Sequence, residues 1–190
     1  MEERMTNRLY FGKEHEMIRK ALGDFVNKEI NPHVEAWEEQ KIAPLHELFK
    51  KMGDLGFLGI RFDPKYGGQG LDYWHDLVFA EEMGNIDAAG ISMAITVQTH
   101  MATPAIAQFG SEYLKETYLS KAISGEMVSA IAVTEPGAGS DVSALATTAV
   151  KQDDHYLLNG SKTYITNGTQ ADFLTLLART SEDPGYHSFS

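Results

Sequence analysis

The sequence has no cysteine among its 190 residues. Disulfide frameworks, thiolate zinc sites and cysteine nucleophiles are therefore excluded. Long apolar runs are also missing. The longest, near Ala88 to Val97, contains Gly90 and Ser92 and falls far short of the roughly 20 residues that a membrane-spanning helix needs. We expect this chain to have no membrane partner.

Basic residues are scarce, because 16 lysines and arginines stand against 27 aspartates and glutamates, a formal net charge of -11. Such a surface repels a polyphosphate backbone, and the sequence has no basic stripe interleaved with aromatic residues. We therefore expect no nucleic-acid partner. The first four residues, Met1–Arg4, are acidic where a targeting peptide would be basic, so no targeting signal is visible.

Apolar residues recur at helical spacing up to about Met127. Pro32 is expected to end the first helix, Asp72 to cap the third, and Gly84 to stop it. The fourth predicted helix, Ile91–Met101, is apolar nearly all round, which predicts that it is buried. The predicted helices are Glu14–Ile30, Pro44–Gly56, Asp72–Met83, Ile91–Met101 and Ser111–Gly125.

After Gly125 the period changes to that of strands. Asn159-Gly160 matches a hairpin turn. The predicted strands are Val128–Thr134, Thr147–Lys151, His155–Leu158, Ser161–Thr166 and Phe173–Ala178. We predict an α+β fold with an amino-terminal all-α domain over residues 1–126 and an antiparallel β domain over 127–190. Because an edge would stay open near Ser190, we expect this β domain to be truncated.

Two sequence patterns begin known site motifs without completing them. His15-Glu16 and His46-Glu47 each start a helical zinc motif, but Arg19 and Lys50 stand where the second histidine is required. Gly137-Ala138-Gly139 has Val142 where a dinucleotide fingerprint needs its third glycine. We predict no metal site, and no nucleotide site of that kind.

The run Thr134–Asp141 follows a predicted strand and reads Thr-Glu-Pro-Gly-Ala-Gly-Ser-Asp. A proline and two glycines shape a loop with exposed amides, which can hold anionic or carbonyl oxygens. Thr134, Ser140 and Thr166 add hydroxyls, and Tyr164 offers a flat face. These residues predict a polar cradle for a planar, hydrogen-bonding ligand, with an ordinary strand–loop–strand as the alternative.

This run, followed after a hairpin by Tyr164-Ile165-Thr166, closely resembles the signature of the acyl-CoA dehydrogenase family. Weaker likenesses cover Gly53–Ile60, Tyr66–Gly70 and the helices to Gly125. The resemblance implies FAD-dependent α,β-desaturation of acyl-CoA thioesters, as in the β-oxidation of fatty acids. It also implies electron-transferring flavoprotein as a partner and a homodimer or homotetramer. The location would be cytoplasmic in a bacterium or the mitochondrial matrix in a eukaryote.

Carried over by position, the resemblance also implies individual residue roles. Thr134 would bond the pyrimidine side of the flavin, Thr166 would reach its N5, and Tyr164 would replace a frequent tryptophan. Ser140, Met93 and Thr96 would contact the acyl-CoA substrate. The predicted cofactor-binding residues are Ile131, Ala132, Val133, Thr134, Gly139, Ser140, Tyr164, Ile165 and Thr166.

The catalytic base has no candidate in this sequence. In the family that glutamate lies in a carboxy-terminal helical bundle, so we expect the base beyond Ser190 and the bundle to be absent here. Glu135 stands at a position that the family does not use as base. We therefore expect a fragment that is inactive alone. The alternatives are an inactive remnant or assembly partner, and a flavin oxidase or monooxygenase on the same scaffold.

Overall fold

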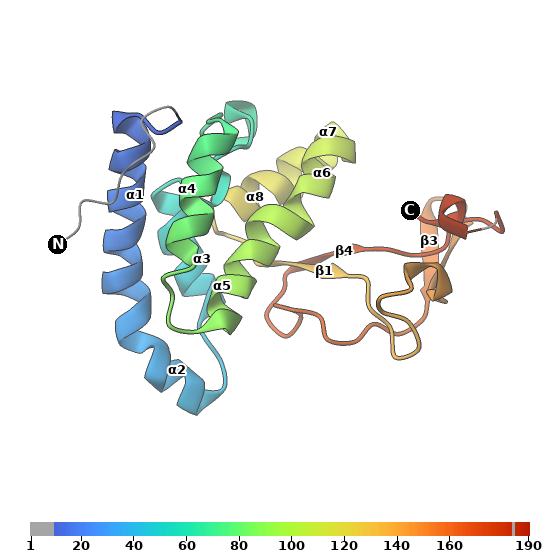
Figure 1. Ribbon diagram of the computed structural model, residues 1–190. Helices are drawn as coiled ribbons and strands as arrows, with labels where there is room; N and C mark the ends of the chain where they lie inside the picture. Colours follow the sequence, from blue (N-terminus) through green and yellow to red (C-terminus); the bar gives the residue numbers. More distant parts are fainter. Residues whose placement is uncertain (1–9, 184) are drawn as a thin grey trace.

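Helices fill the amino-terminal part of the molecule and strands extend from it, as Figure 1 shows. The structure, a computed structural model, describes residues 10–183 and 185–190. The α-helices are α1 (Lys13–Phe25), α2 (Val34–Gln40), α3 (Leu45–Asp54), α4 (Tyr73–Met83), α5 (Ala89–Thr96), α6 (Thr103–Phe109), α7 (Glu112–Leu114) and α8 (Ser120–Ile123). The order of helices followed by a small β region confirms the predicted fold class.

Short π and 3-10 turns connect or extend these helices, and two further 3-10 turns, η7 (Val142–Ala144) and η8 (Gly185–Ser188), lie in the β region. The π turns are η1 (Val26–Ile30), η5 (Val97–Ala102) and η6 (Lys115–Leu119). The 3-10 turns among the helices are η2 (Asn31–His33), η3 (Phe57–Gly59) and η4 (Pro64–Tyr66). As a result, α5, η5 and α6 form one continuous helical segment from Ala89 to Phe109.

One apolar core holds the helices together. Leu22 of α1, Phe49 of α3, Phe79 of α4 and Ile95 of α5 are all at most 1% exposed. Each large side chain removed from water contributes about 1.5–3 kcal/mol to folding before the entropy cost is counted. The amphipathic spacing read from the sequence therefore places the correct faces inward.

Four predicted helix boundaries are confirmed, at Asp72, Gly84, Ser111 and Gly125. Asp72 caps α4, because its carboxylate accepts from the backbone N–H groups of Trp74 and His75 at 3.1 and 3.2 Å, and Gly84 ends that helix. Ser111 caps α7 through the N–H of Leu114. Gly125 has φ +73°, and a Cβ there would lie 2.0 Å from the Phe49 carbonyl oxygen, so only glycine fits.

Two helical expectations need correction. Pro32 does not end the first helical stretch, because it lies within η2, at the start of a turn where its missing N–H costs little, and the chain continues into α2. The Ile91–Met101 stretch is not buried all round: Met93 and Met101 are 48% and 44% exposed. The core covers the opposite side of this segment.

The strands form two separate pairs. β1 (Ser129–Ala132) pairs with β4 (Phe173–Leu176) in parallel, with Ser129 opposite Phe173. β2 (Thr148–Gln152) pairs with β3 (His155–Asn159) in antiparallel fashion. The expected antiparallel pairing is thus correct for the hairpin and wrong for β1 and β4. The turn between β2 and β3 is Asp153–Asp154. The hairpin turn expected at Asn159-Gly160 is therefore wrong, because Asn159 is the last residue of β3 and pairs with Thr148.

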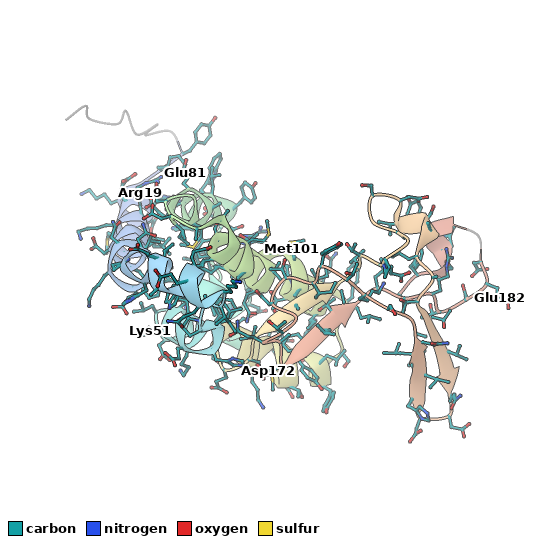
Figure 2. All side chains as sticks on the ribbon, turned by 90° about the horizontal axis from the view of Figure 1, so that it is seen from below. Arg19, Lys51, Glu81, Met101, Asp172 and Glu182 are labelled. Atoms are coloured by element: carbon teal, nitrogen blue, oxygen red, sulfur yellow. The ribbon has the colours of Figure 1, made fainter. Side chains whose placement is uncertain are left out.

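The β2–β3 hairpin projects away from the helices, as Figure 2 shows, and Asp172 lies back against them. Its carboxylate accepts from the Val128 N–H at 2.8 Å and lies 3.0 Å from Nε2 of His46. On the hairpin, Tyr156 and Leu158 are each 55% exposed. Among the described residues, no helix has both the length and the apolar character that a membrane crossing requires.

Gln98 joins the helices to β1. Its side chain is buried, and Nε2 donates to the carbonyls of Ala122 at 3.0 Å and Met127 at 2.9 Å. Its Oε1 accepts from both the N–H and the hydroxyl of Ser129 at 2.7 Å. All four hydrogen-bonding positions of the amide are therefore used, and they connect η5, α8, the residues after α8, and β1.

Gln98→Leu should lower the free energy of unfolding by about 3 kcal/mol, because it keeps a similar side-chain size but leaves buried backbone groups without partners. Urea unfolding followed by circular dichroism measures this loss. Gln152→Leu, on the exposed end of β2, is the matched control and should change stability by less than about 0.5 kcal/mol. Equal effects of the two substitutions would contradict the structural role of Gln98.

Candidate functional site

Two segments that are distant in sequence meet beside β1. The first leads from β1 through Thr134 into the loop that ends at Asp141, and the second runs from Lys162 to Gly168. The N–H of Thr163 donates to the carbonyl of Thr134 at 2.9 Å, which links the two segments directly. The structure therefore brings together the two motifs that the sequence analysis singled out.

A buried ion pair shapes the first segment. Nζ of Lys162 lies 2.9 Å from the Glu135 carboxylate, and their side chains are 9% and 7% exposed. Lys162 also donates to the carbonyl of Val133 at 2.8 Å. The Glu135 carboxylate accepts from the N–H groups of Ala146 and Thr147 at 2.7 and 2.9 Å. These contacts fix the start of the loop against Lys162 and against the residues that lead into β2.

The same contacts set the charge of Glu135. Burial alone would raise the pKa of its carboxyl group, but the donors of Thr147 and Ala146 and the Lys162 ammonium lower this pKa to about 2. Glu135 is thus a carboxylate with its oxygens already engaged. A group with so low a pKa is a poor general base, which agrees with the expectation that Glu135 is not the catalytic base.

The second segment is an irregular loop, so the expected strand over Ser161–Thr166 is wrong. Tyr164 and Asn167 have left-handed backbone angles, with φ of 55° and 67°, which break the pleat of a strand. Nδ2 of Asn167 donates to the carbonyls of Ala94 at 3.0 Å and Ser129 at 3.1 Å. This amide holds the loop against α5 and β1 at once.

The predicted cofactor residues differ in accessibility. Ala132 is buried in β1, and Ile131, Val133, Thr134, Ile165 and Thr166 are half-buried. Gly139 and Ser140 are exposed, and the Tyr164 ring is 92% exposed. Within the described residues, the hydroxyls of Thr134, Ser140 and Thr166 make no hydrogen bond to the protein. They are free to bond a ligand.

A cavity of about 360 Å³ adjoins the second segment. It brings Thr166 and Asn167 next to Gly90, Ile91 and Ala94 of α5. The predicted substrate residues Met93 and Thr96 are on α5 but do not line this cavity, and the Thr96 hydroxyl donates to the Ser92 carbonyl at 2.9 Å. The site roles assigned to individual residues therefore stay predictions.

The arrangement fits a planar cofactor with polar edges. An exposed aromatic ring lies on a loop bearing an unbonded hydroxyl at Thr166, and the neighbouring loop exposes backbone around Gly137, Gly139 and Ser140. In the part of the chain that the structure describes, the buried Oδ1 of Asn167 also has no partner. FAD has the flat ring system and the hydrogen-bonding edges that such groups accept.

Three structurally important residues escaped the sequence analysis. Gln98 and Asn167 act through contacts to distant backbone groups, and nothing in the local pattern marks them. Lys162 lies two residues before the Tyr164-Ile165-Thr166 motif and has no role assigned from the sequence. Lys162 directly precedes Thr163-Tyr164, and Glu135 lies inside the first motif. A basic residue beside one motif and an acidic residue within the other is the signal that suggests an ion pair.

Comparisons with known proteins match both parts of the chain. The family described as acyl-CoA dehydrogenase, N-terminal domain, matches residues 12–126, and acyl-CoA dehydrogenase, middle domain, matches residues 130–190. An acyl-CoA dehydrogenase of Bacillus subtilis is 40% identical over 182 residues, which is 96% of this chain and 48% of that protein. The chain spans about half the length of the curated relatives it matches.

Solved structures agree with this likeness. The acyl-CoA dehydrogenase from Geobacillus kaustophilus superposes with a TM-score of 0.88 at 40% identity, covering 95% of this chain and 47% of that one. An acyl-CoA dehydrogenase complexed with FAD from Bacillus anthracis gives a TM-score of 0.83 at 36% identity, with 90% and 29% covered. At these identities the likeness extends from fold to family.

Glu135→Gln should remove a pH-dependent contribution of the Glu135 carboxylate to the free energy of unfolding. The folded pKa of Glu135 lies below its ordinary value of 4.5, so its contribution is present above about pH 4.5 and is lost as pH falls towards 2. We expect the variant to be roughly 3 kcal/mol less stable than wild type at pH 6, with more than half of this difference gone at pH 3. Guanidinium unfolding at both pH values measures it.

Glu182→Gln is the matched control, because Glu182 is exposed. It should change stability by less than about 0.5 kcal/mol at either pH. A Glu135→Gln penalty that is the same at pH 6 and pH 3 would show that the carboxylate charge does not stabilise the fold.

Proposed function

This chain belongs to the acyl-CoA dehydrogenase family, and on that premise we propose that it forms the flavin-holding half of an enzyme that desaturates acyl-CoA thioesters between the α and β carbons. One observation carries the proposal. The two motif segments meet through the Thr163 N–H and the Thr134 carbonyl at 2.9 Å, and the exposed ring of Tyr164 lies next to that link.

When bound, FAD supplies the acceptor that takes the hydride from the β carbon. The chain's own residues have binding and orienting roles. Thr134 would bond the pyrimidine side of the flavin, Thr166 would reach its N5, and Tyr164 would lie beside its ring system. The remaining cofactor contacts come from Ile131, Ala132, Val133, Gly139, Ser140 and Ile165. Placing these donors in advance lowers the cost of orienting the reacting groups.

Substrate contacts in this proposal involve Ser140, Met93 and Thr96. Removal of the α proton needs a carboxylate in a water-poor site, where burial raises its pKa. Glu135 does not fill this role, because three protein groups already hold its oxygens. We place the catalytic base in a part of the enzyme outside the 190 residues of this chain. Electron-transferring flavoprotein as acceptor and a homo-oligomeric assembly belong to the same proposal.

Thr166→Val, made in a full-length protein that contains this chain, should change the anaerobic rate of flavin reduction by acyl-CoA by up to about tenfold with little effect on folding. The reason is the loss of one hydrogen bond of about 0.5–1.5 kcal/mol at N5. Thr117→Val, in η6, is the matched control. Reduction rates that are the same in both variants and in wild type would reject the role given to Thr166.

The 190-residue chain alone should bind FAD weakly or not at all and should not desaturate acyl-CoA. Loosely supported donors lose the preorganisation on which affinity depends, and a site open to water does not raise the pKa of a carboxylate. The measurement is flavin bleaching without oxygen, with excess FAD and acyl-CoA of several lengths. Substrate-dependent bleaching at about 1 per second or faster would place the base within this chain.

A further inference from the structure

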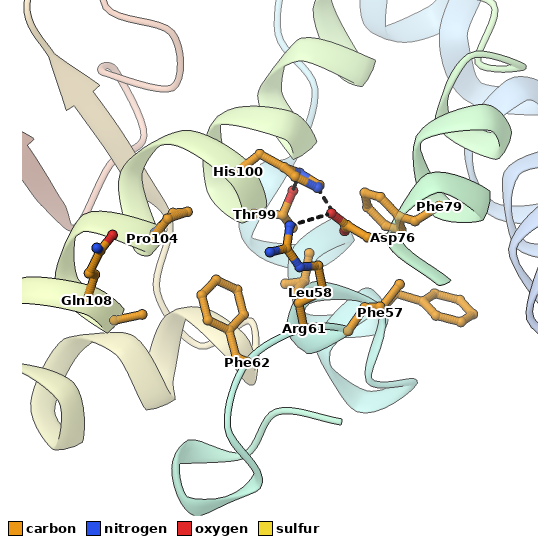
Figure 3. Close-up of a pocket in the computed structure, with 12 residues that line it drawn as sticks. Phe57, Leu58, Arg61, Phe62, Asp76, Phe79, Thr99, His100, Pro104 and Gln108 are labelled. Carbon is orange, nitrogen blue, oxygen red and sulfur yellow. Dashed lines mark hydrogen bonds and ion pairs between the residues drawn. The ribbon is translucent and has the colours of Figure 1, made fainter. Parts of the chain in front are cut away.

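A second cavity, of about 410 Å³, lies on another side of the helical region. Figure 3 shows it between the loop after α3, helix α4 and the segment from η5 to α6. Its lining is mixed, and the apolar part includes Phe57, Leu58, Phe62, Phe79 and Pro104. None of the residues predicted to bind cofactor or substrate lines it. Its volume lies within the roughly 300–1,000 Å³ typical of small-molecule sites.

A polar group of three side chains stands at one side of these apolar walls. Oδ2 of Asp76 accepts from Arg61 at 3.1 Å, and its Oδ1 lies 2.9 Å from Nε2 of His100. The Asp76 side chain is 11% exposed. Burial alone would raise the pKa of Asp76, but His100 and Arg61 lower it below its ordinary value. Asp76 is therefore an anion that holds two donors at the cavity wall.

Arg61 keeps hydrogen-bonding capacity after this pairing. A guanidinium has five N–H donors, and within the described residues the Arg61 side chain makes a hydrogen bond to Asp76 alone. Its side chain is 50% exposed, and it lies over the Tyr73 ring at 5.4 Å. The contacts with Asp76 and Tyr73 fix the plane of the fork and leave further N–H groups available to a ligand in the cavity.

We propose that this cavity binds a small amphipathic monocarboxylate, with its carboxylate on Arg61 and its hydrocarbon part against Phe62 and Pro104. The guanidinium fork matches the planar carboxylate and bonds it through two parallel hydrogen bonds. A dianion such as a phosphate monoester is disfavoured, because Asp76 lies beside the same fork and repels a doubly charged ligand more strongly. The site is independent of the flavin-holding segments.

Isothermal titration of the 190-residue chain with octanoate tests the proposal, with 1-octanol as the uncharged ligand of equal chain length. Octanoate should bind saturably and more tightly than 1-octanol. Arg61→Met should weaken octanoate binding about tenfold or more while leaving 1-octanol unchanged, because it removes only the charged hydrogen bonds. Arg61→Lys keeps the positive charge but lacks the guanidinium fork. Its affinity for octanoate should lie between those of wild type and Arg61→Met.

Two further variants keep the result interpretable, with circular dichroism confirming that each is folded. Ala107→Phe fills the cavity and should abolish binding of both ligands, which separates this site from any acyl site beside the flavin. Lys121→Met removes an exposed cation elsewhere and should change nothing. Absence of saturable octanoate binding, equal affinity of wild type and Arg61→Met, or octanoate binding that survives Ala107→Phe would each overturn the proposal.

Discussion

Backbone groups at the junction of helices and strands must be hydrogen-bonded away from water, and two side-chain amides meet this need. Gln98 bonds the backbone of Ala122, Met127 and Ser129, and Asn167 bonds the carbonyls of Ala94 and Ser129. An unpaired buried backbone group costs about 1–3 kcal/mol. Both motif segments are therefore positioned relative to α5 by contacts that involve no residue of the Thr134–Asp141 run.

The Glu135–Lys162 pair adds a second constraint closer to the proposed cofactor. Each partner comes from a different segment, and both side chains are buried, so removing either leaves an uncompensated charge. The pair also explains why an acid near the start of the Thr134–Asp141 run does not act as a base. The Glu135 oxygens bond Lys162 and two backbone N–H groups, while within the described residues the hydroxyls of Thr134 and Ser140 make no hydrogen bond to the protein.

Features determined by local interactions could be predicted from the sequence, and features determined by distant contacts could not. The cap at Asp72 and the ends of α4 follow from neighbouring residues, and they were predicted correctly. The parallel pairing of β1 with β4 and the loop form of Ser161–Thr166 depend on residues far along the chain. Gln98 has no local signature at all. The class of ligand was inferred from the resemblance of the Thr134–Asp141 run to a family signature. Hydrophobic periodicity alone does not indicate a ligand.

Hydrogen exchange at the backbone amides, measured on a full-length protein that contains this chain, with and without FAD, tests the central claim most directly. If the two segments form one cofactor site, FAD should slow exchange at residues 134–140 and 163–168 together and leave the β2–β3 hairpin unchanged. The Thr163 amide, which joins the segments, should be among the protected ones. No change in either segment, or protection confined to one of them, would contradict the account.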